Sequence, residues 1–167
     1  MPYQDDKKEK GREAETNFQE WLRKNEIAYM RFLQDIDSSS PTFFKKYMAK
    51  RPDFMILIPH VGSILVDVKH KKQTEKRPEE FDINERETKH YCNFQNYFNM
   101  QVWYVFSSGQ YTTWHWIPVS KVLELGTLHE IKEKEEDNYC SVKIKEFLQV
   151  KSDENIGRLF TEMSKFY

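Results

Sequence analysis

The sequence predicts an α/β protein in which helices cover a mixed β-sheet. Helical and strand-like segments alternate along the chain, and two short β-rich segments near its middle flank a glycine-containing turn, which predicts a hairpin. Aromatic residues make up 15% of the 167 residues, so large side chains are available for a core although 32% of the chain is charged. A chain this rich in aromatic residues is not disordered over its whole length.

The N-terminal quarter predicts a helix followed by a strand. Residues 1–10 are mostly polar, and we expect a flexible tail there. From Gly11 to about Asn25, apolar residues recur at the spacing of one helix face, at Ala14, Phe18, Trp21 and Leu22. Residues 27–33 are expected to form a strand, and the Ser-Ser-Ser-Pro sequence at 38–41 a loop.

The predicted hairpin consists of residues 53–58 and 64–69, with Gly62 available for the turn. If the turn is centred near Val61 and Gly62, the numbers of paired residues add up to about 122–123. Asp53 would then lie opposite Lys69 or the next residue, and diagonal to Asp67.

A polar loop over 70–81 should lead to a helix that ends near Asn99. Asp82 precedes Glu85 by three residues, which is the spacing of a helix N-cap. The later segments predict strands at 101–107, 113–117 and 139–145, helices at 119–125 and 153–165, and a charged loop at 132–138. The sequence contains no internal repeat or low-complexity linker, so we expect a single domain over 11–167.

The composition excludes some classes of function and leaves others open. No apolar segment approaches the ~18 residues of a membrane helix, and no signal peptide is present, so a cytoplasmic protein is expected. Cys92 and Cys140 lack the spacing of a metal site or a disulfide framework. The net charge of −1 does not itself indicate a nucleic-acid partner. However, residues 43–77 contain nine basic and three acidic residues, as a phosphate-binding face would, although chance clustering gives the same pattern.

Two carboxylates and an ammonium are expected at one end of the hairpin. Side chains alternate along a strand, so Leu65, Asp67 and Lys69 share one face, and Asp53 starts the neighbouring strand. Two close carboxylates repel each other unless a proton or a cation lies between them, and their oxygens suit Mg²⁺. A purely structural Asp–Lys pair explains the same residues, and the geometry alone leaves both interpretations open.

Arg51-Pro52-Asp53, followed after thirteen residues by Asp67-Val68-Lys69, resembles the signature of the PD-(D/E)XK, or restriction-endonuclease-like, nuclease superfamily. The segment Gly11-Arg12-Glu13-Ala14-Glu15 resembles the Gly-plus-Glu helix of its Holliday-junction-resolvase-like branch. The order of predicted elements also agrees over about 11–107, whereas 108–167 match no family pattern. The resemblance implies a restriction-endonuclease-like core.

The resemblance also implies roles for individual residues. Asp53 and Asp67 would ligate the metal together with the carbonyl of Val68, and Lys69 would orient or activate the attacking water. The implied cofactor is Mg²⁺, with Mn²⁺ expected to substitute.

The two glutamates of the first predicted helix, Glu13 and Glu15, lie on different faces of that helix. Glu15, Phe18 and Leu22 are three and four residues apart, so Glu15 borders the buried face, whereas Glu13 lies on the solvent side. We therefore expect Glu15 to make a water-mediated metal contact. The alternative is that both are ordinary surface acids.

Other residues are weaker candidates. Family members often place a polar residue of the second helix near the metal, which here would be Gln95 or Tyr91, although Tyr91 also fits a core position. Basic residues after the second strand could hold phosphates or could form a solvated loop; these are Lys71, Lys72, Lys76 and Arg77. Trp114 and Trp116 share a strand face that could stack bases, but packing against a helix is favoured. The five histidines lack metal spacing.

The resemblance thus implies a Mg²⁺-dependent endonuclease that acts on DNA, with RNA left open as a substrate, and cutting both strands would favour a homodimer. A nuclease-fold protein that binds nucleic acid or another partner without cleaving it is the alternative. Clustered carboxylates that repel phosphate favour the enzyme. An unrelated α/β domain would have the two aspartates far apart.

Overall fold

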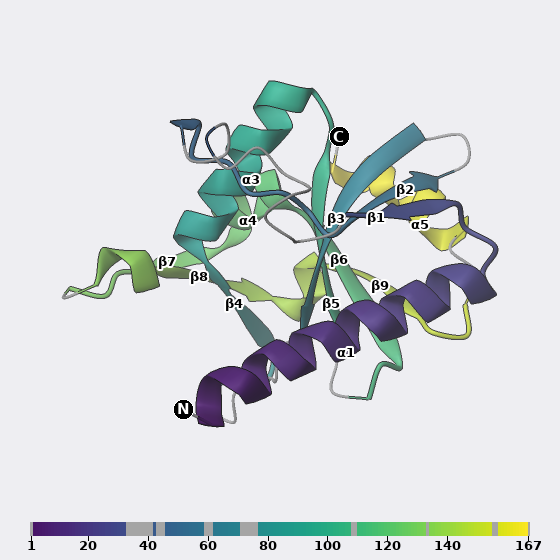
Figure 1. Cartoon of the computed structure of the whole chain (residues 1–167), viewed down its shortest axis with the longest axis horizontal. Helices are drawn as coiled ribbons and strands as arrows, with labels where there is room; N and C mark the ends of the chain where they lie inside the picture. The colour runs from purple at the N-terminus through teal and green to yellow at the C-terminus, as the bar shows by residue number, and fades with distance from the viewer. Residues whose placement is uncertain are drawn as a thin grey trace.

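The computed structural model describes residues 2–32, 42, 46–58, 62–70, 77–107, 110–132, 134–154 and 157–166. A six-stranded sheet forms its centre, with the order β1-β2-β3-β5-β6-β9 (Figure 1). The strands are β1 (Tyr29–Arg31), β2 (Phe54–Ile58), β3 (Gly62–His70), β5 (Val102–Ser107), β6 (Thr113–Pro118) and β9 (Leu148–Lys151). Only the pairing of β3 with β5 is parallel among the described strand pairs of this sheet. The predicted α/β class, with a mixed central sheet flanked by helices, is confirmed.

A second, three-stranded sheet has the order β4-β8-β7. Its strands are β4 (Glu80–Asn84), β7 (Thr127–His129) and β8 (Tyr139–Lys143), and short 3-10 turns follow at η1 (Glu135–Asp137) and η2 (Ile144–Glu146). Of these strands the sequence predicted only the one at 139–145. The missed strands are short, and their formation depends on pairing with β8, which no local pattern shows.

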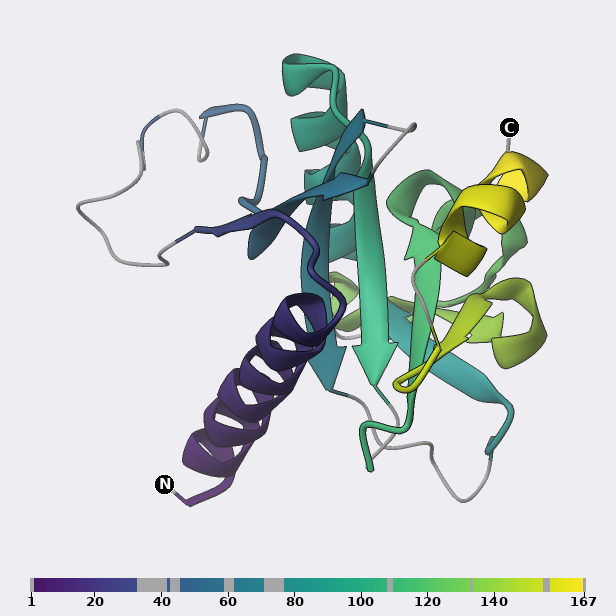
Figure 2. The ribbon, with the colours of Figure 1, turned by 90° about the vertical axis from the view of Figure 1, so that its right-hand side faces the viewer.

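One face of the central sheet packs against α1 (Pro2–Lys24), α5 (Gly157–Glu162) and the turn η3 (Met163–Phe166). Phe18 of α1 is fully buried, with its ring centroid 5.2 Å from that of Trp114 and 5.6 Å from that of Trp116. Both tryptophans are buried core residues, so the favoured packing against a helix is confirmed and neither ring is accessible for stacking with a base. Figure 2 shows α1 and the C-terminal helix beside the strands.

Helix α1 begins at Pro2, so it extends through the segment for which a flexible tail was expected. Proline suits the first helical position because its φ is already helical and it needs no N–H partner there. Residues 3–10 contain neither glycine nor a β-branched residue, so nothing in them stops the helix.

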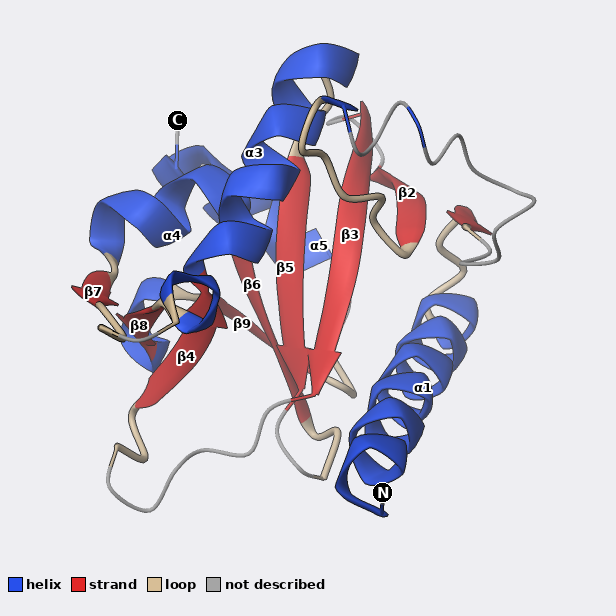
Figure 3. Ribbon diagram, turned by 60° about the vertical axis from the view of Figure 1, so that its left-hand side comes forward, coloured by secondary structure: helices blue, strands red, loops and turns tan. Residues whose placement is uncertain are grey.

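The other face packs against α3 (Glu85–Phe98) and α4 (Val119–Leu125), as Figure 3 shows for α3 beside β5. Along β3, Ile64, Val66 and Val68 belong to the core on the α1 side, whereas Leu65 belongs to the core on the α3 side. This is the predicted alternation, and it places Asp67 and Lys69 on the α3 side.

The register of the hairpin differs from the predicted one. Phe54 pairs with Val66 and Ile58 with Gly62, so paired residue numbers add up to 120. Gly62 adopts φ +111°, which strongly favours glycine. The turn residues 59–61 lie outside the described residues. The shift is sufficient to place Asp53 beside Asp67 rather than opposite Lys69, so the expected diagonal arrangement is wrong.

Helix α3 is capped by Asn84 rather than by Asp82. The Asn84 side chain accepts a hydrogen bond from the Glu87 N–H at 2.8 Å. Asp82 instead belongs to β4, where Ser141 donates to its carboxylate at 2.8 Å. The pairing of β4 with β8 thus delays the helix start. The helix ends near Asn99 as predicted, since Asn99 adopts the left-handed conformation.

The C-terminal part agrees with the sequence in most elements. The helix predicted at 119–125 is α4, and the last predicted helix is shorter, consisting of α5 and η3. In the described ranges, no helix combines the length and apolar character that a membrane span requires.

Candidate active site

Asp53 and Asp67 lie side by side where β2 begins and β3 nears its end. The Asp53 N–H donates to the Val66 carbonyl at 2.9 Å, and Asp53 Oδ2 accepts from the Val68 N–H at 2.9 Å. These contacts are to the residues on either side of Asp67. Asp53 is 7% exposed and Asp67 1% exposed, so two carboxyl groups are buried together.

Burial, and after it the charge of Asp67, raises the pKa of Asp53 from 3.8 to about 8. The Val68 N–H opposes this increase, and the charge of Glu15 adds to it. Asp53 therefore carries a proton at neutral pH unless a cation takes its place. The two buried carboxyl groups of Asp53 and Asp67 therefore favour the binding of a cation.

Lys69 lies between two carboxylates. Its Nζ is 2.7 Å from Asp67 Oδ2 and 2.8 Å from Glu87 Oε1. Burial lowers the pKa of Lys69, but Asp67 and Glu87 outweigh this effect and raise it well above its ordinary value. Lys69 is consequently an ammonium next to the aspartate pair.

Helix α3 adds two residues to this group. The Tyr91 hydroxyl donates to Asp67 Oδ1, and Tyr91 is completely buried. Burial, followed by the charge of Asp67, raises the Tyr91 pKa well above its ordinary value, so Tyr91 remains a hydrogen-bond donor. Gln95, one turn further along, accepts from the Val102 N–H at 3.1 Å and supports the start of β5. The structure thus brings Tyr91, but not Gln95, into contact with an aspartate of the pair.

Glu87 and Lys50 also belong to the site, although the sequence did not predict them. Lys50 Nζ contacts Glu87 Oε1 and lies 4.0 Å from Asp67 Oδ1. Burial alone would raise the Glu87 pKa, but the ammonium groups of Lys69 and Lys50 lower it to about 2. A signal existed for Glu87, since it precedes Tyr91 by four residues and shares its helix face.

The two glutamates of α1 have different partners. Glu15 contributes to the raised pKa of Asp53, and its Oε2 pairs with an Arg31 nitrogen at 2.5 Å. Glu13 instead interacts with Tyr111, whose pKa is raised by burial and then by this carboxylate. The water-mediated contact of Glu15 with a metal stays a prediction.

The basic candidates are only partly described. Lys71, Lys72 and Lys76 lie outside the described residues. Arg77 lies beside the three-stranded sheet, where it donates to Asp82 Oδ2 at 3.0 Å and to the Tyr139 hydroxyl at 3.2 Å. Its guanidinium thus has protein partners, and its contact with phosphate stays a prediction.

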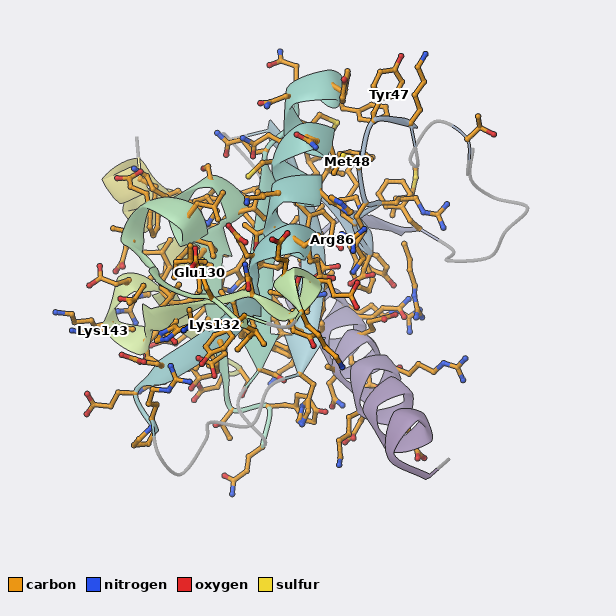
Figure 4. All side chains as sticks on the ribbon, turned by 90° about the vertical axis from the view of Figure 1, so that its left-hand side faces the viewer. Tyr47, Met48, Arg86, Glu130, Lys132 and Lys143 are labelled. Carbon is orange, nitrogen blue, oxygen red and sulfur yellow. The ribbon has the colours of Figure 1, made fainter. Side chains whose placement is uncertain are left out.

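A groove of about 860 Å³ is lined by residues of α3 other than those of the candidate site, together with Met48 and residues of the segment 128–138. Figure 4 shows Met48, Arg86, Glu130 and Lys132, which belong to its lining. The charged lining residues are four bases and four acids, namely Arg86, Lys89, Lys132, Lys134, Glu85, Glu130, Glu135 and Glu136. This balance does not favour a polyanion in the groove.

The residues around Asp67 fit a divalent cation with few protein ligands. None of the described residues donates a well-aligned hydrogen bond to Asp67 Oδ2, which is buried and faces Lys69 as an ion pair. No group of three His, Cys, Asp or Glu side chains with metal-site geometry occurs in the described part of the chain. Two carboxylates with a backbone carbonyl and water match Mg²⁺, which commonly retains several waters.

The sheet order and the position of the two strands define a restriction-endonuclease-like fold, confirming the predicted fold class. Among solved structures, the chain is similar to Hjc, a Holliday junction resolvase from Archaeoglobus fulgidus, with 15% identity and a TM-score of 0.53. The alignment covers 84% of this chain and 92% of Hjc. At this identity the likeness establishes the fold alone.

A second similar structure is D212, a nuclease from a fusselovirus, with 12% identity and a TM-score of 0.44. That alignment covers 89% of this chain and 87% of D212. No model of a known protein family matches the chain. No curated protein sequence matches it either.

Proposed function

We propose that this protein is a metal-dependent endonuclease that hydrolyses phosphodiester bonds in DNA. The observation that carries the proposal is the meeting of Asp53, Asp67 and Lys69, with both carboxyls buried and the ammonium 2.7 Å from one of them. The fold that this chain shares with Hjc, a protein described as a Holliday junction resolvase, supports the same proposal.

Asp53, Asp67 and the Val68 carbonyl would hold Mg²⁺, with Glu15 contributing through water. When bound, the metal supplies Lewis-acid polarisation of the phosphate and neutralises its charge. Lys69 orients the attacking water and favours its deprotonation by adding positive charge where hydroxide must form. Tyr91 holds Asp67 in place through its hydrogen bond to Oδ1.

The proposal is tested by cleavage assays with different metals. Ca²⁺ accepts looser coordination and acidifies bound water less than Mg²⁺ does, so it should fill the site without supporting attack. We expect DNA binding in Ca²⁺, and cleavage only in Mg²⁺ or Mn²⁺. The substrates are supercoiled plasmid, branched DNA, single-stranded DNA and structured RNA, followed over time. Absence of cleavage of every substrate in Mn²⁺ would leave a nuclease-fold binding protein as the explanation.

Lys71 and Lys72 are expected to contribute phosphate contacts. Replacing both by alanine should weaken binding to all DNA sequences alike, and should flatten the salt dependence by roughly one slope unit per lost contact. The measurement is DNA affinity in Ca²⁺ at several salt concentrations.

The matched control replaces Lys143 and Lys145, two exposed lysines, and Figure 4 shows Lys143 away from α3. This variant removes the same charge without touching the predicted DNA face. Equal effects of the two double substitutions would assign the change to net charge and contradict a specific role for Lys71 and Lys72.

A further inference from the structure

Four side chains of alternating charge close into a ring at the candidate site. Lys69 Nζ lies 2.7 Å from Asp67 Oδ2 and 2.8 Å from Glu87 Oε1. Lys50 Nζ contacts the same Glu87 oxygen and lies 4.0 Å from Asp67 Oδ1. The motif on which the proposed function rests contains neither Glu87 nor Lys50.

The ring places a cation where the metal would need to be. A Mg²⁺ ion bound to Asp67 at about 2.0–2.1 Å would lie close to the Lys69 ammonium, and the two positive charges would repel each other. Lys69 must then move away from Asp67. Glu87 is a second acceptor that Lys69 already contacts, so the ammonium can move without losing all of its partners.

Lys50 and Lys69 differ in how easily their ammonium groups can move away from Asp67. The Lys50 side chain is 39% exposed and can exchange its carboxylates for water, whereas the Lys69 side chain is 21% exposed. The Asp67 side chain is only 2% exposed. A buried ammonium without a counter-charge is costly, so Lys69 depends on Glu87 more than Lys50 does.

We propose that Glu87 is a positioning residue that receives the Lys69 ammonium from Asp67 when the metal binds, and that Lys50 competes with the metal for this acidic site. The inference rests on the proposed function for the identity of the incoming cation. Glu87 keeps Lys69 beside the reacting water, and its negative charge favours the metal. Lys50 has the opposite effect, because its charge adds to the repulsion of the metal.

The first test measures Mn²⁺ binding to the full chain without DNA, by electron paramagnetic resonance. Glu87→Gln should weaken Mn²⁺ binding about tenfold or more, because one nearby negative charge is removed. Lys50→Met should tighten it several-fold, and the double variant should return toward the parent. Circular dichroism checks that each variant is folded.

Glu85→Gln is the matched control. Glu85 lies on the same helix, pairs with Lys89 at 2.6 Å, and its replacement changes the net charge equally. Its Mn²⁺ affinity should stay within about twofold of the parent, since the charge of Glu85 is paired with Lys89 and its contacts are with Lys89 and Asn138 rather than with the ring. Parent-like affinity of Glu87→Gln, or weaker binding by Lys50→Met, would overturn the inference, because a merely structural ring predicts losses in both variants.

A second measurement separates this inference from the proposed function. NMR of the metal-free protein detects the ammonium groups of Lys69 and Lys50. Their signals show whether the two lysines form the ion pairs of the ring in the absence of metal. With Mg²⁺ added, the Lys69 signal should shift and persist in the parent but disappear in Glu87→Gln. If the parent binds no Mn²⁺, the proposed metal requirement fails, while the metal-free spectra still show whether Glu87 holds Lys69. Unchanged Lys69 signals in metal-free and Mg²⁺-treated Glu87→Gln would overturn the role of Glu87.

Discussion

Replacing Lys69 by alanine is expected to reduce DNA cleavage by about 100-fold or more while Mn²⁺ remains bound. The substitution removes the ammonium 2.7 Å from Asp67 Oδ2 and leaves every proposed metal ligand in place. Binding of Mn²⁺ should not weaken, because a neighbouring positive charge is lost. The measurements are the rate of plasmid cleavage in Mn²⁺ and the affinity for Mn²⁺ without DNA.

Two further variants complete this experiment. Asp67→Asn should lose both Mn²⁺ binding and cleavage, because it removes a negative charge from the proposed ligands. Lys89→Ala is the control, since Lys89 is an exposed lysine of α3 that pairs with Glu85. Cleavage by Lys69→Ala at the parent rate would contradict the role given to Lys69.

Replacing Asp53 by asparagine is expected to change how the stability of the metal-free protein depends on pH. The folded-state pKa of Asp53 is raised from 3.8 to about 8, chiefly by burial and then by Asp67. Its protonated form therefore stabilises the fold fully below its unfolded pKa, and this contribution is lost as the pH rises through the folded pKa. Between these values, the parent should lose up to about 1.4 kcal/mol of unfolding free energy per pH unit relative to the variant.

The comparison between parent and Asp53→Asn isolates this one group. The lowered pKa of Glu87, about 2, gives stability that is lost only as the pH falls through acidic values. His90 and His115 have pKa values lowered mainly by burial, and they titrate alike in both proteins. Urea denaturation with a chelator present gives the required free energies. Parallel pH profiles of the two proteins would contradict a raised Asp53 pKa.

The buried acids also bear on the choice between an enzyme and a binding protein. Asp53 and Asp67 are both buried, and such a pair destabilises the fold unless a proton or cation neutralises it. A protein that only binds DNA gains nothing from carboxylates that repel phosphate. The proposed function accounts for both carboxylates, because together they would hold a cation at the scissile bond.

The sequence by itself determined the elements whose apolar residues recur regularly. The stripe from Ala14 to Leu22 predicted the packed part of α1, and the alternation along β3 predicted that Asp67 and Lys69 share a face. The Arg-Pro-Asp and Asp-Val-Lys segments predicted the fold through their resemblance to a nuclease superfamily. These features are local, because a helix or strand period depends on neighbouring residues alone.

The tertiary structure alone decided the hairpin register, the capping of α3 by Asn84 and the ring that includes Lys50 and Glu87. Register depends on how β2 and β3 bury their side chains against two helix layers, and the observed register makes Asp53 and Asp67 neighbours. Lys50 and Glu87 are 37 residues apart and meet only because α3 packs against the sheet. Residues so distant share no sequence period, so packing of the whole chain decides which charges surround Asp67.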